Sequence, residues 1–154
     1  MDIRKFCRSQ PRKKFSWSDY LHATSTHLDL QGDAYLAFFE LFRPRFIEVD
    51  GVIFVSELFS RKEYDESLAR GRTSLTIQPW MNMLEITALF NSIELKDAKR
   101  IADAVSHSWN DKLIAEFGSN SIQAQVIVEE AQDEVFVTVG QFQTASGRSK
   151  AHSG

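Results

Sequence analysis

The stretch FIEVDGVIFVS, residues 46–56, places an apolar run on each side of Asp50-Gly51. An Asp-Gly pair between two such runs is the strongest short signal for a β-hairpin, because both turn positions need a positive φ angle that these residues tolerate. A two-residue turn also fixes the cross-strand partners, which are Val49–Val52, Ile47–Phe54 and Phe46–Val55.

Both faces of this hairpin carry apolar side chains. One face holds Ile47, Val49, Val52 and Phe54, and the other holds Phe46, Ile53, Val55 and the carboxylate of Glu48. A hairpin with one wet side would have one polar face, so we expect cover on both sides, with the far face covered by a helix beginning at Asp33 or by the segment around Trp17. The alternative is a partner surface around Phe46, Ile53 and Val55. Glu48 would then lie at its rim, because charged residues are depleted from interface cores.

A second hairpin is predicted at residues 124–139, with an acidic turn at residues 130–133. Its inward pairs are Val128–Val135, Val126–Val137 and Ala124–Val139. The reverse face is mostly polar, with Gln123, Gln125 and Thr138, and it carries Ile127 and Phe136 near the turn. This pattern is typical of a half-buried antiparallel pair with a wet outer side.

Two aromatic-rich segments before the first hairpin have the spacing of helices. Residues 17–26 follow Ser16, a candidate cap. Residues 33–43 lie between the candidate cap Asp33 and the breaker Pro44. The second segment is apolar nearly all round, which predicts a helix buried on most sides.

Two further helices follow the first hairpin. Ser60 and Glu63 form a capping-box pattern, and Gly71 ends that helix. Residues 94–117 repeat apolar positions every three to four residues and form the longest predicted helix. A strand is predicted at residues 81–87, with a bulge near Met83. The fold class is therefore α+β: an antiparallel sheet of four or five strands, including the two hairpins, packed by a long C-terminal helix and shorter aromatic-rich helices.

The 154 residues are predicted to form a basic flexible arm at 1–15, a single domain at 16–143 and a disordered tail at 144–154. The one cysteine, Cys7, can form no internal disulfide, which fits a cytoplasmic protein. Apolar runs are too short for a membrane span. Residues 1–14 carry six basic residues and one acid, a net +5, whereas the other 140 carry 12 basic and 20 acidic residues, a net −8. An acidic body favours cationic partners over nucleic acid.

The densest acidic cluster lies at the turn of the second hairpin. We predict that a basic protein partner meets these carboxylates and Glu48, with aromatic anchors at Phe46 and Phe136. The four clustered acids are Glu129, Glu130, Asp133 and Glu134. A small acidic chain with one cysteine and aromatic surface candidates resembles, in kind, the immunity proteins that neutralise basic bacterial toxins. The resemblance implies a non-catalytic, antitoxin-type inhibitor.

Three alternatives stay open. An enzyme could use Asp103, His107 and Asp111, which are spaced four residues apart on the long helix, or a pocket near Glu48 and Glu85. The sequence carries none of the usual nucleotide, metal or nucleophile motifs, so we predict no cofactor, no metal and no catalysis. A regulatory module could bind nucleic acid through residues 1–15. A homodimer could cover the second face of the first hairpin.

Overall fold

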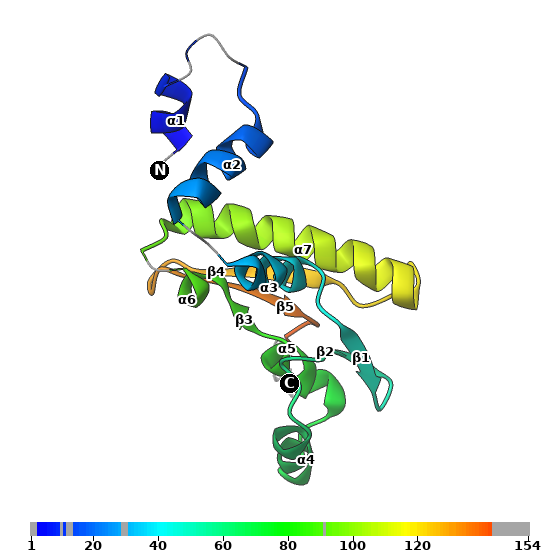
Figure 1. The fold of residues 1–154 in the computed structure, drawn as a ribbon. Coiled ribbons are helices and arrows are strands. Elements are labelled where there is room, and N and C mark those ends of the chain that lie inside the picture. Colours follow the sequence, from blue (N-terminus) through cyan, green and yellow to red (C-terminus); the bar gives the residue numbers. More distant parts are fainter. Residues whose placement is uncertain (1–2, 10, 12–13, 29–30, 91, 143–154) are drawn as a thin grey trace, which may run out of the picture. The chain divides into compact units, whose positions relative to one another are not determined.

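The computed structural model describes residues 3–9, 11, 14–28, 31–90 and 92–142. The chain divides into two compact units, Met1–Phe39 and Glu40–Gly154. Figure 1 labels the helices and strands in chain order. The predicted tail at 144–154 lies outside the described residues, as do parts of the predicted arm.

The first unit is helical. It contains α1 (Ile3–Ser9), α2 (Trp17–Leu28) and the greater part of α3 (Gly32–Phe42). Phe6 on α1 is 5% exposed and meets the ring of Tyr20 on α2 edge to face, with centroids 5.4 Å apart. Residues 3–9 of the predicted arm thus form α1, and this helix packs on α2 through aromatic rings. The boundary between the two units falls after Phe39.

The predicted aromatic helices are confirmed, but the predicted burial of α3 is not found. No residue of α3 is fully buried. Its last turn, Leu41 and Phe42, belongs to the second unit and packs against that unit's core. The pattern, which is apolar nearly all round, had predicted a helix buried on most sides.

The second unit begins with the hairpin of β1 (Phe46–Val49) and β2 (Val52–Val55). Asp50 and Gly51 have φ angles of 53° and 74°, so both turn positions have the positive φ that a tight two-residue turn requires. The observed partners are Val49–Val52, Glu48–Ile53, Ile47–Phe54 and Phe46–Val55. The register predicted from the Asp-Gly turn is therefore confirmed.

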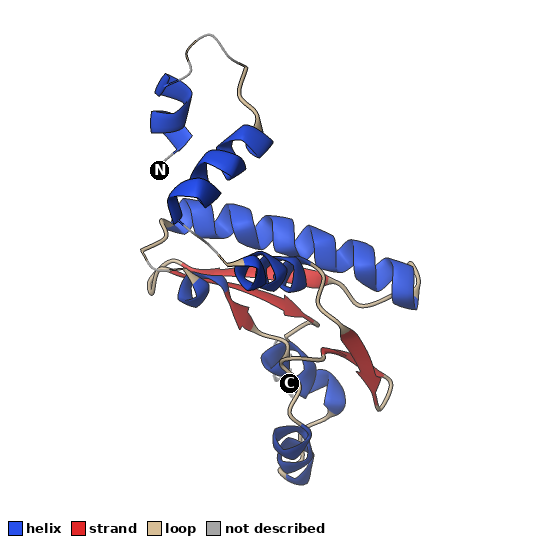
Figure 2. Cartoon of the chain, in the orientation of Figure 1, coloured by secondary structure: helices blue, strands red, loops and turns tan. Residues whose placement is uncertain are grey.

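The second sheet has three antiparallel strands in the order β3-β5-β4. They are β3 (Leu84–Glu85), β4 (Ala124–Glu129) and β5 (Glu134–Val139). The pairs Val128–Val135, Val126–Val137 and Ala124–Val139 are those predicted. Figure 2 shows the red strands in these two separate groups.

The predicted strand at residues 81–87 is wrong except at Leu84 and Glu85. Helix α5 (Ser74–Met81) runs into its start, and helix α6 (Ile86–Leu89) takes its end. Thr73 caps α5 by accepting a hydrogen bond from the Thr76 N–H, and Thr76 accepts one from the Thr73 N–H in return. Because this capping box uses threonine at its fourth position, a search for glutamate or glutamine there misses it.

The five strands form two sheets, whereas the sequence predicted one. The side chain of Asn82, which is fully buried, joins the two sheets. Its Oδ1 accepts from the Val55 N–H at 2.8 Å, and its Nδ2 donates to the carbonyls of Ile53 and Val139, each at 3.1 Å. One amide side chain thus satisfies backbone groups of β2 and β5 that a continuous ladder would have paired.

The first hairpin is covered on both faces, as predicted. Helices α4 (Arg61–Ala69) and α5 cover one face, where Tyr64 and Ile77 pack with Val52 and Phe54. Helix α7 (Leu95–Phe117) and the end of α3 cover the other face. The sequence predicted cover from the helix that begins near Asp33, but it did not predict cover from α4 and α5.

Helix α7 organises the larger core. It packs along one face of the three-stranded sheet, and its buried positions include Ala98, Ala102, Val105, Trp109 and Leu113. The indole Nε1 of Trp109 donates to the Leu41 carbonyl at 2.9 Å, which ties α3 to α7. Among the described residues, no helix has both the length and the apolar character needed to cross a lipid bilayer.

Candidate functional site

The face of the three-stranded sheet turned away from α7 carries an apolar pair near the β4–β5 turn. Ile127 on β4 lies directly opposite Phe136 on β5. Both side chains are partly exposed, and neither belongs to a core cluster of the described residues. On the other side of Phe136, β3 places Glu85 opposite it. Ile127, Phe136 and Glu85 therefore form one row across the sheet, because cross-strand partners share a face.

The next row on this face is a pair of glutamates. Glu129 lies directly opposite Glu134. Like charges directly opposite each other destabilise a sheet, whereas favourable cross-strand pairs stabilise it by about 0.2–1 kcal/mol. Glu130 and Asp133 in the adjoining turn are exposed. We call the combined surface the acidic face; it consists of Glu85, Ile127, Glu129, Glu130, Asp133, Glu134 and Phe136.

The acidic face lacks counter-charges of its own. In the part of the chain that the structure describes, the ion pairs lie on α4 and on or beside α7, and none includes a carboxylate of the acidic face. Glu85 is held by a neutral group, because the Thr87 hydroxyl donates to Glu85 Oε1 at 3.1 Å. The same hydroxyl accepts from the Val135 N–H at 3.3 Å, which ties this end of β3 to β5.

The first hairpin contributes less surface than its sequence suggested. Phe46 is 6% exposed and Ile53 is 9% exposed. The ring of Phe46 meets that of Trp109 edge to face, with centroids 6.0 Å apart. Both residues belong to the core because α7 covers their face, so they cannot serve as surface anchors in this conformation. Phe136 is the predicted anchor that keeps part of its surface.

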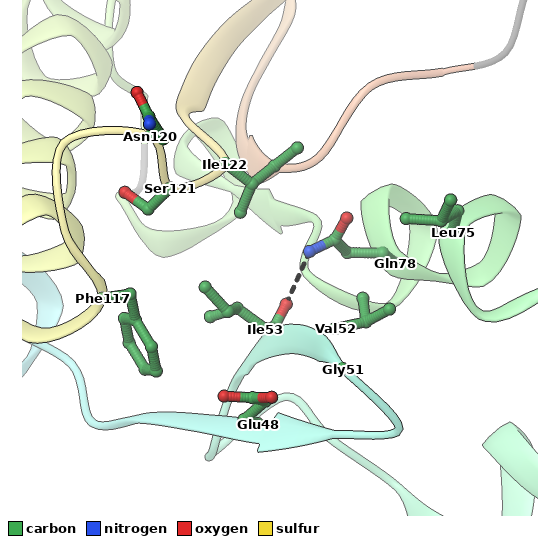
Figure 3. Close-up of a pocket in the computed structure, with 10 residues that line it drawn as sticks. All are labelled: Glu48, Gly51, Val52, Ile53, Leu75, Gln78, Phe117, Asn120, Ser121 and Ile122. Atoms are coloured by element: carbon green, nitrogen blue, oxygen red, sulfur yellow. Dashed lines mark hydrogen bonds between the residues drawn. The ribbon is translucent and has the colours of Figure 1, made fainter.

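Glu48 is exposed and lines a pocket beside the hairpin (Figure 3). The cavity has a volume of about 340 Å³. Three segments form its walls: the β1–β2 hairpin, α5, and the end of α7 with the loop that follows it. Glu85 is not among the lining residues, so the structure does not bring Glu48 and Glu85 into this pocket.

Asp103, His107 and Asp111 lie on α7, as the sequence predicted. The Asp103 carboxylate forms an ion pair with Lys99, with Nζ 2.9 Å from Oδ2. His107 Nδ1 lies 2.7 Å from the backbone carbonyl of Asp103, one turn earlier, and both His107 and Asp111 are exposed. Among the described residues, no group of three or more histidine, cysteine, aspartate or glutamate side chains is placed to hold a metal ion.

A scan against protein-family models and searches of curated proteins and of solved structures find no match to this chain. The candidate site therefore depends on geometry alone. Sequence reasoning placed Phe136 and Ile127 near the turn but missed Glu85 as their neighbour, because the length of its strand was predicted wrongly. It also missed the pocket residues Gln78, Phe117 and Ser121, which come together from segments far apart in the chain.

Proposed function

We propose that this chain is a non-catalytic binding protein whose acidic face docks a basic surface of another protein. The observation that carries the proposal is the Glu129–Glu134 pair beside the partly exposed Ile127–Phe136 pair. Opposed carboxylates work against sheet stability. A partner that supplies cations there relieves the repulsion when it binds.

The two kinds of side chain on this face have different roles in association. The carboxylates raise the rate of encounter with a cationic surface through long-range attraction, and they select against acidic partners. Phe136 and Ile127 supply apolar area that loses water only when a partner covers it. Aromatic residues are enriched among the few positions that dominate binding energy. Phe136 is therefore the expected anchor, and the carboxylates form its rim.

The finer proposal is an inhibitor of the immunity or antitoxin type, which neutralises a basic protein by covering its cationic site. This class fits a small acidic face that has an apolar centre, since a cationic active site presents positive charge around a cleft. The proposal needs only a rigid surface and no catalytic group.

The test is affinity capture with the full chain from a lysate of the source organism, comparing Glu129→Lys with the wild type. Wild type should retain one basic protein in stoichiometric amount, and the variant should lose it. Glu57→Lys is the matched control: Glu57 is exposed in the turn after β2 and undergoes the same change of charge. That control should retain the partner.

Stability measurements separate lost binding from lost folding. Replacing one opposed glutamate by lysine converts a repulsive pair into an attractive one, so Glu129→Lys should raise the free energy of unfolding by about 0.5–1 kcal/mol. Urea denaturation of both variants measures this change. Retention of the same partner by Glu129→Lys would refute the assignment of the acidic face, and so would capture that is insensitive to salt.

A further inference from the structure

The pocket beside the first hairpin is separate from the acidic face and shares no residue with it. Its volume of about 340 Å³ lies at the small end of the range of known ligand sites. Such a cavity admits a small molecule or one side chain of a partner. Figure 3 shows Glu48 rising from β1 toward the space between the hairpin and the loop after α7, with the Phe117 ring on the same side.

The charge of the pocket determines whether a cation or an anion can bind there. Among the described residues that line it, Glu48 is the one that carries a charge. Within the described residues no ion pair neutralises this carboxylate, and no lysine or arginine lines the cavity. A phosphate or carboxylate ligand would meet repulsion and find no cation. A cation would gain both an opposite charge and the negative face of the Phe117 ring.

The neutral groups of the pocket narrow the choice of cation. The Ser121 Oγ is buried, and no hydrogen-bond partner for it is found in the described part of the chain. Asn120 adds an exposed amide beside it. The amide nitrogen of Gln78 is already used, because its Nε2 donates to the Ile53 carbonyl at 2.9 Å. The lining thus offers a carboxylate together with the neutral amide of Asn120, whereas the Ser121 Oγ is enclosed by the protein.

We propose that this pocket binds a guanidinium group, paired with the Glu48 carboxylate and flanked by the Phe117 ring. A guanidinium presents five N–H donors in a plane, and two of them match the two oxygens of one carboxylate. The remaining donors can bind water. A planar cation also stacks on an aromatic ring more readily than a strongly hydrated ammonium does. The group can belong to a free small molecule or to an arginine of a protein.

The test is a titration of isotope-labelled full chain with methylguanidinium and with agmatine, followed by amide NMR. The backbone signals of Gly51, Asn120 and Ser121 should shift and saturate. Methylammonium should bind more weakly, and inorganic phosphate should produce no shift at these residues. Absence of shifts with both guanidinium compounds, or equal binding of methylammonium, would overturn the proposal.

Glu48→Gln keeps the shape of the side chain and removes its charge, so it should weaken guanidinium binding by about tenfold or more. Glu57→Gln is the control and should bind as the wild type does. Both residues are exposed, and the unperturbed part of the amide spectrum reports whether each variant is folded. Equal affinity of the two variants would refute the role of Glu48.

A further arm distinguishes the two sources of the group. A short peptide with one arginine should bind more tightly than agmatine if the natural occupant is a protein side chain, and its lysine counterpart should bind less tightly. Tighter binding of agmatine assigns the pocket to a free small molecule. The proposed docking on the acidic face is tested by Glu129→Lys, so failure at Glu48 leaves that proposal intact.

Discussion

Replacing Asn82 by alanine should destabilise the second unit strongly, because this one side chain joins the two sheets. The substitution removes the acceptor of the Val55 N–H and the donor to the Val139 carbonyl. The Ile53 carbonyl also loses a donor, but it keeps the Gln78 amide at 2.9 Å. Two buried backbone groups are therefore left without the partner that Asn82 supplied.

The size of the effect follows from these two groups. Each buried polar group that loses its partner costs about 1–3 kcal/mol, and the space left by a fully buried amide adds to that cost. We expect Asn82→Ala to lower the free energy of unfolding by about 4 kcal/mol. Domains are stable by about 5–15 kcal/mol, so a large share of the total stability is removed.

Urea denaturation followed by circular dichroism measures the change. With a slope near 2 kcal/mol per molar, the midpoint should fall by about 2 M. Asn120→Ala is the control, because Asn120 is exposed in the loop after α7 and its loss should cost about 0.5 kcal/mol or less. If the two variants lost equal stability, the bridge formed by Asn82 would not hold the sheets together.

Asn82→Asp separates the acceptor from the donor role. The introduced carboxyl can still accept from Val55, but when ionised it cannot donate to Val139, and it places a charge in the core. Burial disfavours the charged form and raises the folded-state pKa of this carboxyl. The variant should therefore recover stability as the pH falls and the carboxyl is protonated. Destabilisation that does not change with pH would show that water reaches this position.

Two further predictions concern side chains that connect helices to neighbouring segments within the second unit. Burial raises the pKa of the Tyr64 hydroxyl, and this hydroxyl donates a hydrogen bond to Asp50 at 2.9 Å. The stability that the neutral hydroxyl contributes is therefore complete below the unfolded-state pKa of 10.0 and is lost as the pH rises above that value. Tyr64→Phe should lower the free energy of unfolding by about 1 kcal/mol at neutral pH. When the pH is raised above 10.0, the variant should lose less stability than the wild type, and urea denaturation at both pH values measures the difference. Trp109→Phe removes the donor to the Leu41 carbonyl and should cost about 1–3 kcal/mol, measured as a fall in Tm of several degrees; an unchanged Tm would contradict a structural role for this bond.

Local sequence signals were sufficient to predict a structural element wherever a few neighbouring residues determine the backbone conformation. Asp50 and Gly51 determine a tight turn, and a tight turn leaves one register for the four residues on each side. The alternation at residues 124–139 determines the second register in the same way, because a slip of one residue would expose every inward valine. The candidate surface residue Phe136 was predicted for this reason, from its position on the polar side of a strand.

The partition into two sheets could not be read from periodicity. The partition depends on Asn82, a polar residue in a segment where alternation predicted a strand. Asn82 can bridge the sheets only when β2 and β5 both lie within hydrogen-bond distance of its side-chain amide. Burial of Phe46 and Ile53 likewise depends on where α7 lies. The pocket residues Glu48, Gln78 and Phe117 come from three separate segments and have no shared local pattern.

The amino-acid sequence by itself determined the hairpin turns, the registers of the two hairpins and the longest helix, because these depend on backbone conformation and side-chain alternation within a few neighbouring residues. Tertiary structure alone decided which apolar faces are covered, how many sheets form and which polar groups line a common cavity. Those outcomes depend on contacts between segments far apart in the chain, where the geometry of approach selects one arrangement among many with similar local patterns.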